Sequence, residues 1–364
     1  MTVTKPEPAA GLCGESHPIL ERVRGRVFPA LREAVDKIGE HDDLLGRIVG
    51  YHLGWNDAAG APGEGDRGGR TVALVLTALA AEAVGASTPQ TLSCAVAMEL
   101  AKDFTQLQDD IIDNDEQRRE RASAWRCFGV GPVLLGADAM RNLALETLAR
   151  NRPHGHNAMW HLQDTLSRVA IGQARDLSFE QRPWSGPRSV TLPEYRAMAE
   201  QKAAALFECA LSLGAVLHGA DPGVVSGLVQ AGHDLGLASQ ALDDLLDIWG
   251  PPGPPGSGFN DLRQGKKSLP IIAALATGTE AARDLAHVLS GPLHDEDRLR
   301  LAADLIDAAG GRHAAEREAR SRYRAAMARL GDLQLPCEKQ AELIEVSALL
   351  GLRGANQSVM LGTL

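Results

Sequence analysis

Residues 96–113 read VAMELAKDFTQLQDDIID, and this stretch decides the fold. Val96, Leu100, Phe104, Leu107 and Ile111 follow one another in steps of three or four residues, which places them on one face of a helix. The stretch ends in an aspartate cluster, DDIID, at positions 109–113. The pattern predicts a long helix with acidic side chains at its C-terminal end.

A second cluster of the same form, DDLLD, occupies positions 243–247 and also follows an apolar helical stretch. Residues four apart share a helix face, so Asp109 stacks on Asp113 and Asp243 on Asp247. Like charges at this spacing weaken a helix unless a cation lies between them. Mg²⁺ takes oxygen ligands and is usually shared with substrate phosphates. One cluster alone would indicate a solvated helix end, but two matched clusters predict facing carboxylates around a metal–diphosphate complex.

The rest of the chain is also patterned as helices. Three stretches rich in Gly, Ala or Pro, at 55–69, 181–190 and 251–260, predict loops, and no repeat or domain linker is evident. We therefore expect an all-α protein with a flexible tail at 1–15 and a single domain at 16–364. Besides the stretch that carries the first cluster, helices are predicted at roughly 17–39, 41–54, 70–84, 131–150, 156–180, 191–218, 223–249, 268–276, 279–289, 294–309, 311–331 and 337–350.

Composition narrows the class of protein. The 364 residues are 44% hydrophobic and 23% charged, which is ordinary for a globular protein, and the net charge of −10 argues against nucleic acid as a partner. The sequence contains no uncharged apolar run of about 18 residues, so we expect no membrane span. We also recognise no signal peptide. The five cysteines are odd in number and widely spaced, which favours reduced thiols in a cytoplasmic protein.

Basic residues follow the clusters or lie between them. Arg118 and Arg119 come just after the first cluster and suit diphosphate oxygens, although arginines near a helix end can also be merely exposed. Lys202 lies in a mostly apolar helical segment, so it either snorkels or points into a polar cavity. Lys266 and Lys267 follow the Pro/Gly loop and are placed to close over the diphosphate.

Together these stretches resemble the trans-isoprenyl diphosphate synthases of the polyprenyl synthetase family, over roughly residues 40–350, and most of all the actinobacterial geranylgeranyl diphosphate synthase type. Residues 103–140 are similar to that family's first aspartate-rich region, 195–217 to its lysine helix, and 235–250 with 261–275 to its second region and lid. The pairs Gly172-Gln173 and Asp176-Leu177 match as well. The resemblance implies an isoprenoid-synthase-type helical bundle around a central cavity, assembled as a homodimer.

The resemblance also implies roles for individual residues. Three Mg²⁺ ions, with Mn²⁺ as the alternative, would bind together with diphosphate. Their principal ligands would be Asp109, Asp113 and Asp243, supported by Asp110, Asp244 and Asp247. The allylic diphosphate would be held by Arg118, Lys202, Gln240 and Lys266. The residues that carry catalysis would be Asp109, Asp113, Asp243, Lys202 and Arg118.

The second substrate, isopentenyl diphosphate, would meet Arg119 through its diphosphate, with Arg70 and Lys102 adding positive charge. Lys102 stands where the family usually has His or Gln, two turns before Asp109 on the same face. Phe104 and Thr105 would line the path of the growing chain. Thr105 is small enough to let a chain pass, which favours a C20 product.

Further positions depart from the family pattern, among them Ala203, which replaces the threonine after Lys202. Ala73 replaces an arginine, Ser257 a lysine and Pro251 an aspartate, so the allylic site is nearly complete while the homoallylic site is altered. The leading hypothesis is a Mg²⁺-dependent trans-prenyltransferase that condenses an allylic diphosphate with isopentenyl diphosphate to a C15–C20 prenyl diphosphate, with geranylgeranyl favoured over farnesyl diphosphate. The alternative is a class I terpene cyclase or non-standard prenyl coupling enzyme. A non-catalytic partner subunit is the third, opposed by the two intact clusters.

Overall fold

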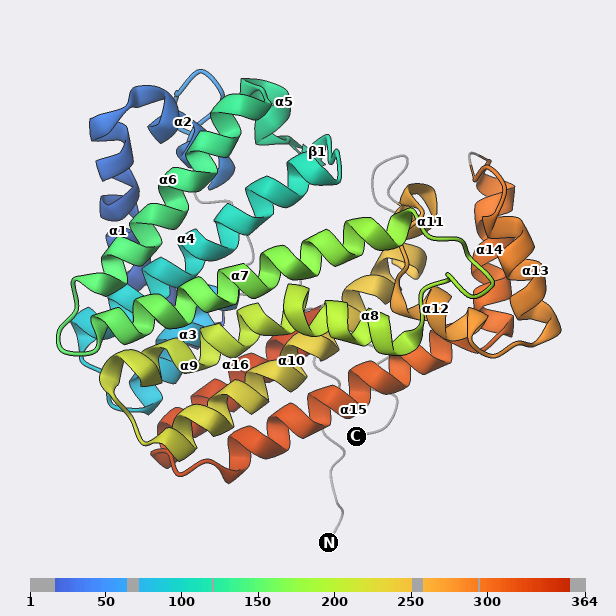
Figure 1. Ribbon diagram of the computed structural model, residues 1–364. Helices are drawn as coiled ribbons and strands as arrows, with labels where there is room; N and C mark the ends of the chain where they lie inside the picture. The colour runs from blue at the N-terminus through green and yellow to red at the C-terminus, as the bar shows by residue number, and fades with distance from the viewer. Residues whose placement is uncertain (1–16, 64–71, 120, 251–257, 294, 354–364) are drawn as a thin grey trace, which may run out of the picture.

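The structure is a computed structural model that describes residues 17–63, 72–119, 121–250, 258–293 and 295–353. Helices dominate the described chain (Figure 1). The longer ones are α1 (Pro18–His41), α3 (Val72–Ala83), α4 (Thr88–Ile112), α6 (Val130–Ala149), α7 (Gly155–Glu180), α9 (Ala205–His218), α10 (Pro222–Trp249), α14 (Glu296–Ala308), α15 (Gly311–Asp332) and α16 (Cys337–Arg353). The shorter ones are α2 (Asp43–His52), α5 (Ala124–Phe128), α8 (Leu192–Ala199), the π-helix η1 (Glu200–Ala204), α11 (Asn260–Gln264), α12 (Leu269–Leu275) and α13 (Glu280–Leu289). A hairpin of β1 (Gln117–Arg118) and β2 (Arg121–Ala122) follows α4.

Local sequence sets the ends of the helices that carry the predicted site. α4 begins at a capping box formed by Ser87 and Gln90, in which the Ser87 backbone nitrogen donates 3.0 Å to the Gln90 side chain. α10 begins where the Asp221 carboxylate accepts from a backbone nitrogen of the first turn at 2.7 Å. α9 ends at Gly219, whose φ of +78° is left-handed and costs little for glycine.

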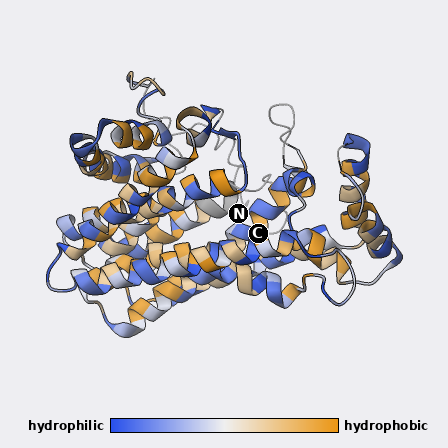
Figure 2. Ribbon diagram, turned by 45° about the horizontal axis from the view of Figure 1, so that its top comes forward, coloured by the Kyte–Doolittle hydropathy of each residue, from blue (hydrophilic) through white to orange (hydrophobic). Residues whose placement is uncertain are grey.

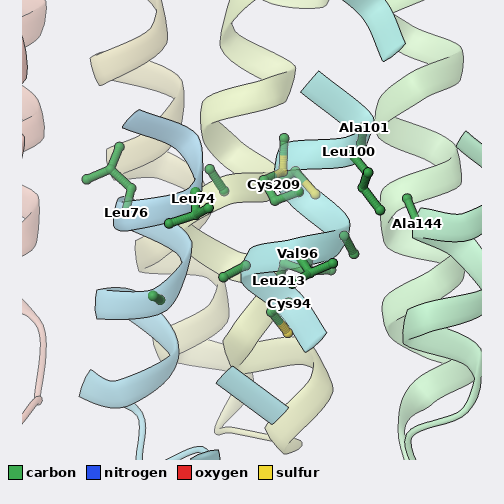
Figure 3. Packing of buried hydrophobic residues seen from close by; sticks show 14 of the residues in the cluster. Leu74, Leu76, Cys94, Val96, Leu100, Ala101, Ala144, Cys209 and Leu213 are labelled. Carbon is green, nitrogen blue, oxygen red and sulfur yellow. The ribbon is translucent and has the colours of Figure 1, made fainter. Parts of the chain in front are cut away.

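The long helices pack side by side. α4 contacts α6 and α3, α9 contacts α3 and α10, and α15 packs along α10. Figure 1 shows α1 and α2 at one end of the molecule and α13 and α14 at the other. Hydrophobic and hydrophilic stretches alternate around the helices in Figure 2, as amphipathic helices require. The largest buried cluster joins α1, α3, α4, α6 and α9, and Figure 3 shows side chains from α3, α4 and α9 meeting in it.

The all-α prediction is confirmed, and the predicted helices are found with small shifts at their ends. Four features were not predicted: the β1–β2 hairpin, α5, α11 and the π-helical turn inside the predicted helix at 191–218. The loop at 181–190 is confirmed. The tail at 1–15 and positions 64–69 and 251–257 of the other predicted loops lie outside the described residues. No described helix is both long and apolar enough to cross a membrane.

Candidate active site

The C-terminal end of α4 carries the first aspartate cluster. Asp110 is buried, and its Oδ1 accepts a hydrogen bond of 2.8 Å from Nε of Arg118. Burial raises the pKa of Asp109 to about 6, with Lys202 opposing this rise and Asp113 adding to it. The cluster therefore contains one carboxylate that orients an arginine and one whose negative charge is disfavoured until more positive charge arrives.

The hairpin after α4 brings two arginines back to that helix. Asn114 and Arg119 have φ values of +55° and +54°, a left-handed conformation that is uncommon for residues other than glycine and marks the turns of the chain. The hairpin places Arg118 against Asp110, whereas Nη2 of Arg119 lies 3.3 Å from Oε1 of Gln106. The two neighbouring arginines thus contact α4 at different positions along the helix.

In the second cluster, at the end of α10, Asp244 turns inward. Its oxygens accept hydrogen bonds from the Tyr195 hydroxyl at 2.6 Å, from the Gln240 amide at 2.7 Å and from the Leu269 backbone nitrogen at 2.7 Å. Asp244 therefore joins α10 to α8 and α12. This arrangement gives internal partners to Asp244 and Gln240, which we expected at the metals and the allylic diphosphate.

Near the second cluster, the negative charges of Asp247 and Asp261 are disfavoured. Asp243 is exposed. Burial and the charge of Asp244 raise the pKa of Asp247 to about 6. Burial raises the pKa of Asp261 well above its usual range, and Asp244 and Asp247 reinforce that rise. Asp261 opens α11 and adds a further carboxylate to the second cluster.

Lys202 lies between the two clusters. Gly172 of α7 approaches so closely that a Cβ there would lie 2.5 Å from the backbone nitrogen of Lys202, so glycine lets α7 meet the π-helical turn. Nζ of Lys202 donates 2.6 Å to Oδ2 of Asp176. Burial opposes the charged ammonium, but Asp176 and Asp109 outweigh it and raise the pKa of Lys202. Its charge also lowers the pKa of Asp247, so this one ammonium acts on both clusters.

Lys266 connects the first cluster to α7. It lies between α11 and α12, and its Nζ is 2.8 Å from Oδ1 of Asp113 and 2.7 Å from Oε1 of Glu180. Burial opposes its charge, but Asp176, Asp113 and Glu180 raise the pKa of Lys266 above its ordinary value. The predicted position of Lys266 beside the aspartates is found. Lys267, which we expected to close over the diphosphate with it, instead lies on the ring of Trp184.

Lys102 is tied to carboxylates on its own helix. Its Nζ lies 2.9 Å from Oε1 of Glu99 and 2.9 Å from Oδ1 of Asp103, and Asp103 also lies 3.4 Å from Nε2 of His52. Arg119 reaches the same carboxylate at 4.0 Å. Lys102 therefore lies at the level of Arg119, and Glu99 and Asp103 compensate its charge.

Three further predicted positions lie along or beside α4. Phe104 and Thr105 are buried a little more than one turn before Asp109. The Phe104 ring faces Arg141 of α6, whose Cζ is 5.8 Å from the ring centroid. Both side chains lie at the level expected for a chain that extends from the aspartates along α4. Arg70 lies outside the described residues, as do Pro251 and Ser257.

The donor set fits a divalent cation that arrives with its diphosphate. No three His, Cys, Asp or Glu side chains within the described ranges enclose a metal ion by themselves. Mg²⁺ rarely occupies an all-protein cage and completes its shell with waters and substrate phosphates. The site offers only oxygen donors, and two of them, Asp109 and Asp247, have raised pKa values. In addition, Oδ2 of Asp110 is buried without a hydrogen-bond partner.

The sequence did not identify several residues that complete this arrangement. Asp176, Glu180 and Asp261 supply carboxylates to the lysines or the second cluster, and Tyr195 positions Asp244. The sequence did indicate Asp176, because the Gly172-Gln173 and Asp176-Leu177 pairs match the family pattern. No sequence pattern indicated Glu180, because its contact with Lys266 joins positions that are 86 residues apart.

Known proteins share both the sequence and the fold. The chain is 36% identical to the (2E,6E)-farnesyl diphosphate synthase of Mycobacterium tuberculosis over 336 residues, which is 91% of each chain. It is also 36% identical over 339 residues to a geranylgeranyl diphosphate synthase of the same organism, covering 91% of this chain and 92% of that one. A polyprenyl synthetase structure from Streptomyces coelicolor A3(2) superimposes with a TM-score of 0.82 at 36% identity, over 91% of this chain and 98% of that chain.

The family model "Polyprenyl synthetase" matches residues 65–306. This range includes both aspartate clusters, the hairpin arginines, Lys202 and the segment that carries Lys266. The expectation drawn from the sequence is therefore confirmed at the level of the family: the chain belongs to the polyprenyl synthetase family.

Proposed function

We propose that the protein is a Mg²⁺-dependent trans-prenyltransferase that condenses an allylic diphosphate with isopentenyl diphosphate to a C15–C20 prenyl diphosphate. The observation that carries the proposal is the position of Lys202, whose ammonium acts on Asp109 of one cluster and Asp247 of the other. Relatives named as farnesyl and geranylgeranyl diphosphate synthases support the product range. We favour geranylgeranyl diphosphate because Thr105 leaves room for a longer chain.

The allylic diphosphate binds where the charges of both clusters meet. Asp109, Asp113 and Asp243 would hold Mg²⁺, which when bound would neutralise negative charge on the departing pyrophosphate. Lys202 and Lys266 bind the same oxygens and stabilise the charge that develops as the C–O bond breaks. Apolar side chains around the allylic tail exclude water from the cation.

The second half of the reaction joins the two substrates. Arg119, with Lys102 and Arg70, binds the diphosphate of isopentenyl diphosphate and directs its double bond at the allylic cation. A new carbon–carbon bond forms, and the proton that is lost passes to the released pyrophosphate. No side-chain nucleophile is required, because the leaving group departs before the alkene attacks.

The charge on the homoallylic side favours testing the terpene cyclase alternative as well. Lys102 is neutralised by Glu99 and Asp103, and Ala73 on α3 stands where the family has an arginine, so the homoallylic side has less free positive charge than the family pattern. Incubation with Mg²⁺ and farnesyl diphosphate, with and without isopentenyl diphosphate, separates the two functions. Geranylgeranyl diphosphate formed only when both substrates are present supports the proposal. A cyclic hydrocarbon formed without isopentenyl diphosphate overturns it.

Exposed apolar side chains on α6 and α7 indicate how the protein assembles. α6 and α7 pack together and expose large apolar side chains, among them Leu135 at 62% and Trp160 at 66% exposure. We infer that a second copy of the chain covers this face to form a homodimer. Light scattering coupled to gel filtration should give twice the chain mass, and Leu135→Glu should lower it. A monomeric wild type would contradict the inference.

Two further statements stay predictions. A cytoplasmic location agrees with the four cysteines among the described residues, all of which are free thiols (Cys94, Cys127, Cys209 and Cys337). A single domain over residues 16–364 agrees with the extensive contacts among α3, α4, α9, α10 and α15.

A further inference from the structure

We propose that Trp184 and Lys267 form a positioning pair that fixes Lys266 at the first aspartate cluster. This inference rests on the proposed function, because it assigns a role to residues that act through a diphosphate-binding lysine. Lys267 is buried at 3% exposure, which is rare for a lysine, and the proposed chemistry makes no use of it.

The contacts of Lys267 show what stabilises its charge. Its Nζ lies 3.2 Å from the centroid of the Trp184 ring and 3.4 Å from the carbonyl oxygen of Gly265. Within the described part of the chain, no carboxylate lies within ion-pair distance of it. Glu180 is the acidic group whose charge reaches it, but Oε1 of Glu180 already bonds Lys266. The tryptophan face therefore takes the place of a carboxylate.

The loop that carries Trp184 is braced. Arg182 donates 2.8 Å to the carbonyl oxygens of Arg188 and Ser189, and its guanidinium forms two hydrogen bonds with Glu194, at 2.7 and 3.1 Å. Trp184 itself packs against the apolar cluster of α10 to α14. The ring is thus held from two sides and can act as a fixed support for Lys267.

The segment between α11 and α12 touches both aspartate clusters. Lys266 bonds Asp113 of the first cluster, and the Leu269 backbone nitrogen bonds Asp244 of the second. Without the contact between Lys267 and Trp184, the side of the segment opposite Asp113 would lose its support, and the Lys266 ammonium would be held less firmly at Asp113. The contact of Lys267 with Trp184 adds a third fixed point to those at Asp113 and Asp244. Glu180, the last residue of α7, and Trp184, four residues further along the chain, therefore hold the two adjacent lysines.

The experiment measures the binding of inorganic pyrophosphate with Mg²⁺ by calorimetry, in addition to the KM values of both substrates. Trp184→Leu should weaken pyrophosphate binding and raise the KM of the allylic diphosphate about tenfold. The KM of isopentenyl diphosphate should not change, because Arg119 and Lys102 lie at another level of α4. Trp184→Phe keeps an aromatic face and should restore most of the affinity.

A pH series separates positioning from simple packing. Burial lowers the pKa of Lys267 to about 8, whereas Lys266 stays charged because its pKa is raised. Relative to Lys267→Arg, which stays charged, the wild type should lose pyrophosphate affinity as the pH rises through 8. Unchanged affinity in Trp184→Leu, with only a lower unfolding temperature, would reduce Trp184 to a packing residue. A wild type that binds pyrophosphate through this pair but forms no prenyl product would overturn the proposed function and leave the pair standing.

Discussion

Replacing Lys202 with methionine removes a positive charge that acts on both aspartate clusters. The ammonium lies 2.6 Å from Asp176 and is mostly buried, so its charge is only weakly screened by water. A unit charge about 4 Å from the departing diphosphate is worth about 4 kcal/mol at an effective dielectric constant of about 20. Because each 1.4 kcal/mol corresponds to about a tenfold change in rate, we expect kcat/KM to fall about 10³-fold.

The assay is pyrophosphate release from an allylic diphosphate and isopentenyl diphosphate in Mg²⁺. Unfolding must be followed in parallel, because Lys202→Met leaves Asp176 without its closest partner and should cost about 1–3 kcal/mol of stability. Lys202→Arg keeps the charge and should retain intermediate activity. Lys37→Met is the matched control, since Lys37 is exposed and its ammonium lies 3.3 Å from the carboxylate of Glu33. A folded Lys202→Met protein that loses less than about tenfold in kcat/KM would refute this reasoning.

The remaining predictions address the metals, the product and the scaffold. Asp243→Ala should abolish turnover and leave the unfolding temperature nearly unchanged, which thermal denaturation beside the activity assay will check. EDTA should stop the reaction and added Mg²⁺ or Mn²⁺ restore it; full turnover after exhaustive chelation would contradict a metal requirement. Thr105→Phe should shorten the product from geranylgeranyl to farnesyl diphosphate, and an unchanged product in mass spectrometry would mean that the chain does not extend along α4. Burial opposes the charge on Glu208, but hydrogen bonds from His233 and Arg168 outweigh it and lower its pKa, while Glu208 raises the pKa of His233. The Glu208 contribution is complete above its unfolded pKa of 4.5 and lost as the pH falls through the folded value; that of His233 is complete below 6.5 and lost as the pH rises through the folded value. The free energy of unfolding that this pair contributes should therefore be greatest between 4.5 and 6.5, and His233→Ala should remove the loss on the alkaline side.

Helical periodicity and the repeated DDxxD pattern were sufficient to predict the fold and the ends of α4 and α10. Both signals are local, because a helix face and the spacing of Asp109 and Asp113 are fixed by residues a few positions apart. The pairing of Lys102 with Glu99 could also have been predicted from the sequence, since residues three apart on a helix are neighbours. Its consequence, a compensated lysine at the homoallylic level, follows from the same spacing.

Contacts between distant segments explain what the sequence did not predict. Asp244 has the same sequence context as a metal ligand, yet Tyr195 and Leu269, 49 and 25 residues away, occupy its oxygens. Lys266 and Lys267 are adjacent and chemically identical, but only the first meets Asp113. Which lysine turns to the site depends on Glu180 and Trp184 of another segment, and no pattern within 261–270 contains that information.

The pairing of the cations explains why a diphosphate should enter this site together with metal ions. Arg118 bonds Asp110, Lys202 bonds Asp176 and Lys266 bonds Asp113, so the basic groups expected to bind the substrate are already neutralised. A diphosphate that took one of these cations alone would leave a buried carboxylate unpaired beside its own negative charge, which is costly. Divalent cations that arrive with it would compensate the carboxylates and free the basic side chains. The burial, reinforced by neighbouring carboxylates, that raises the pKa values of Asp109 and Asp247 is then the feature that couples metal and substrate binding.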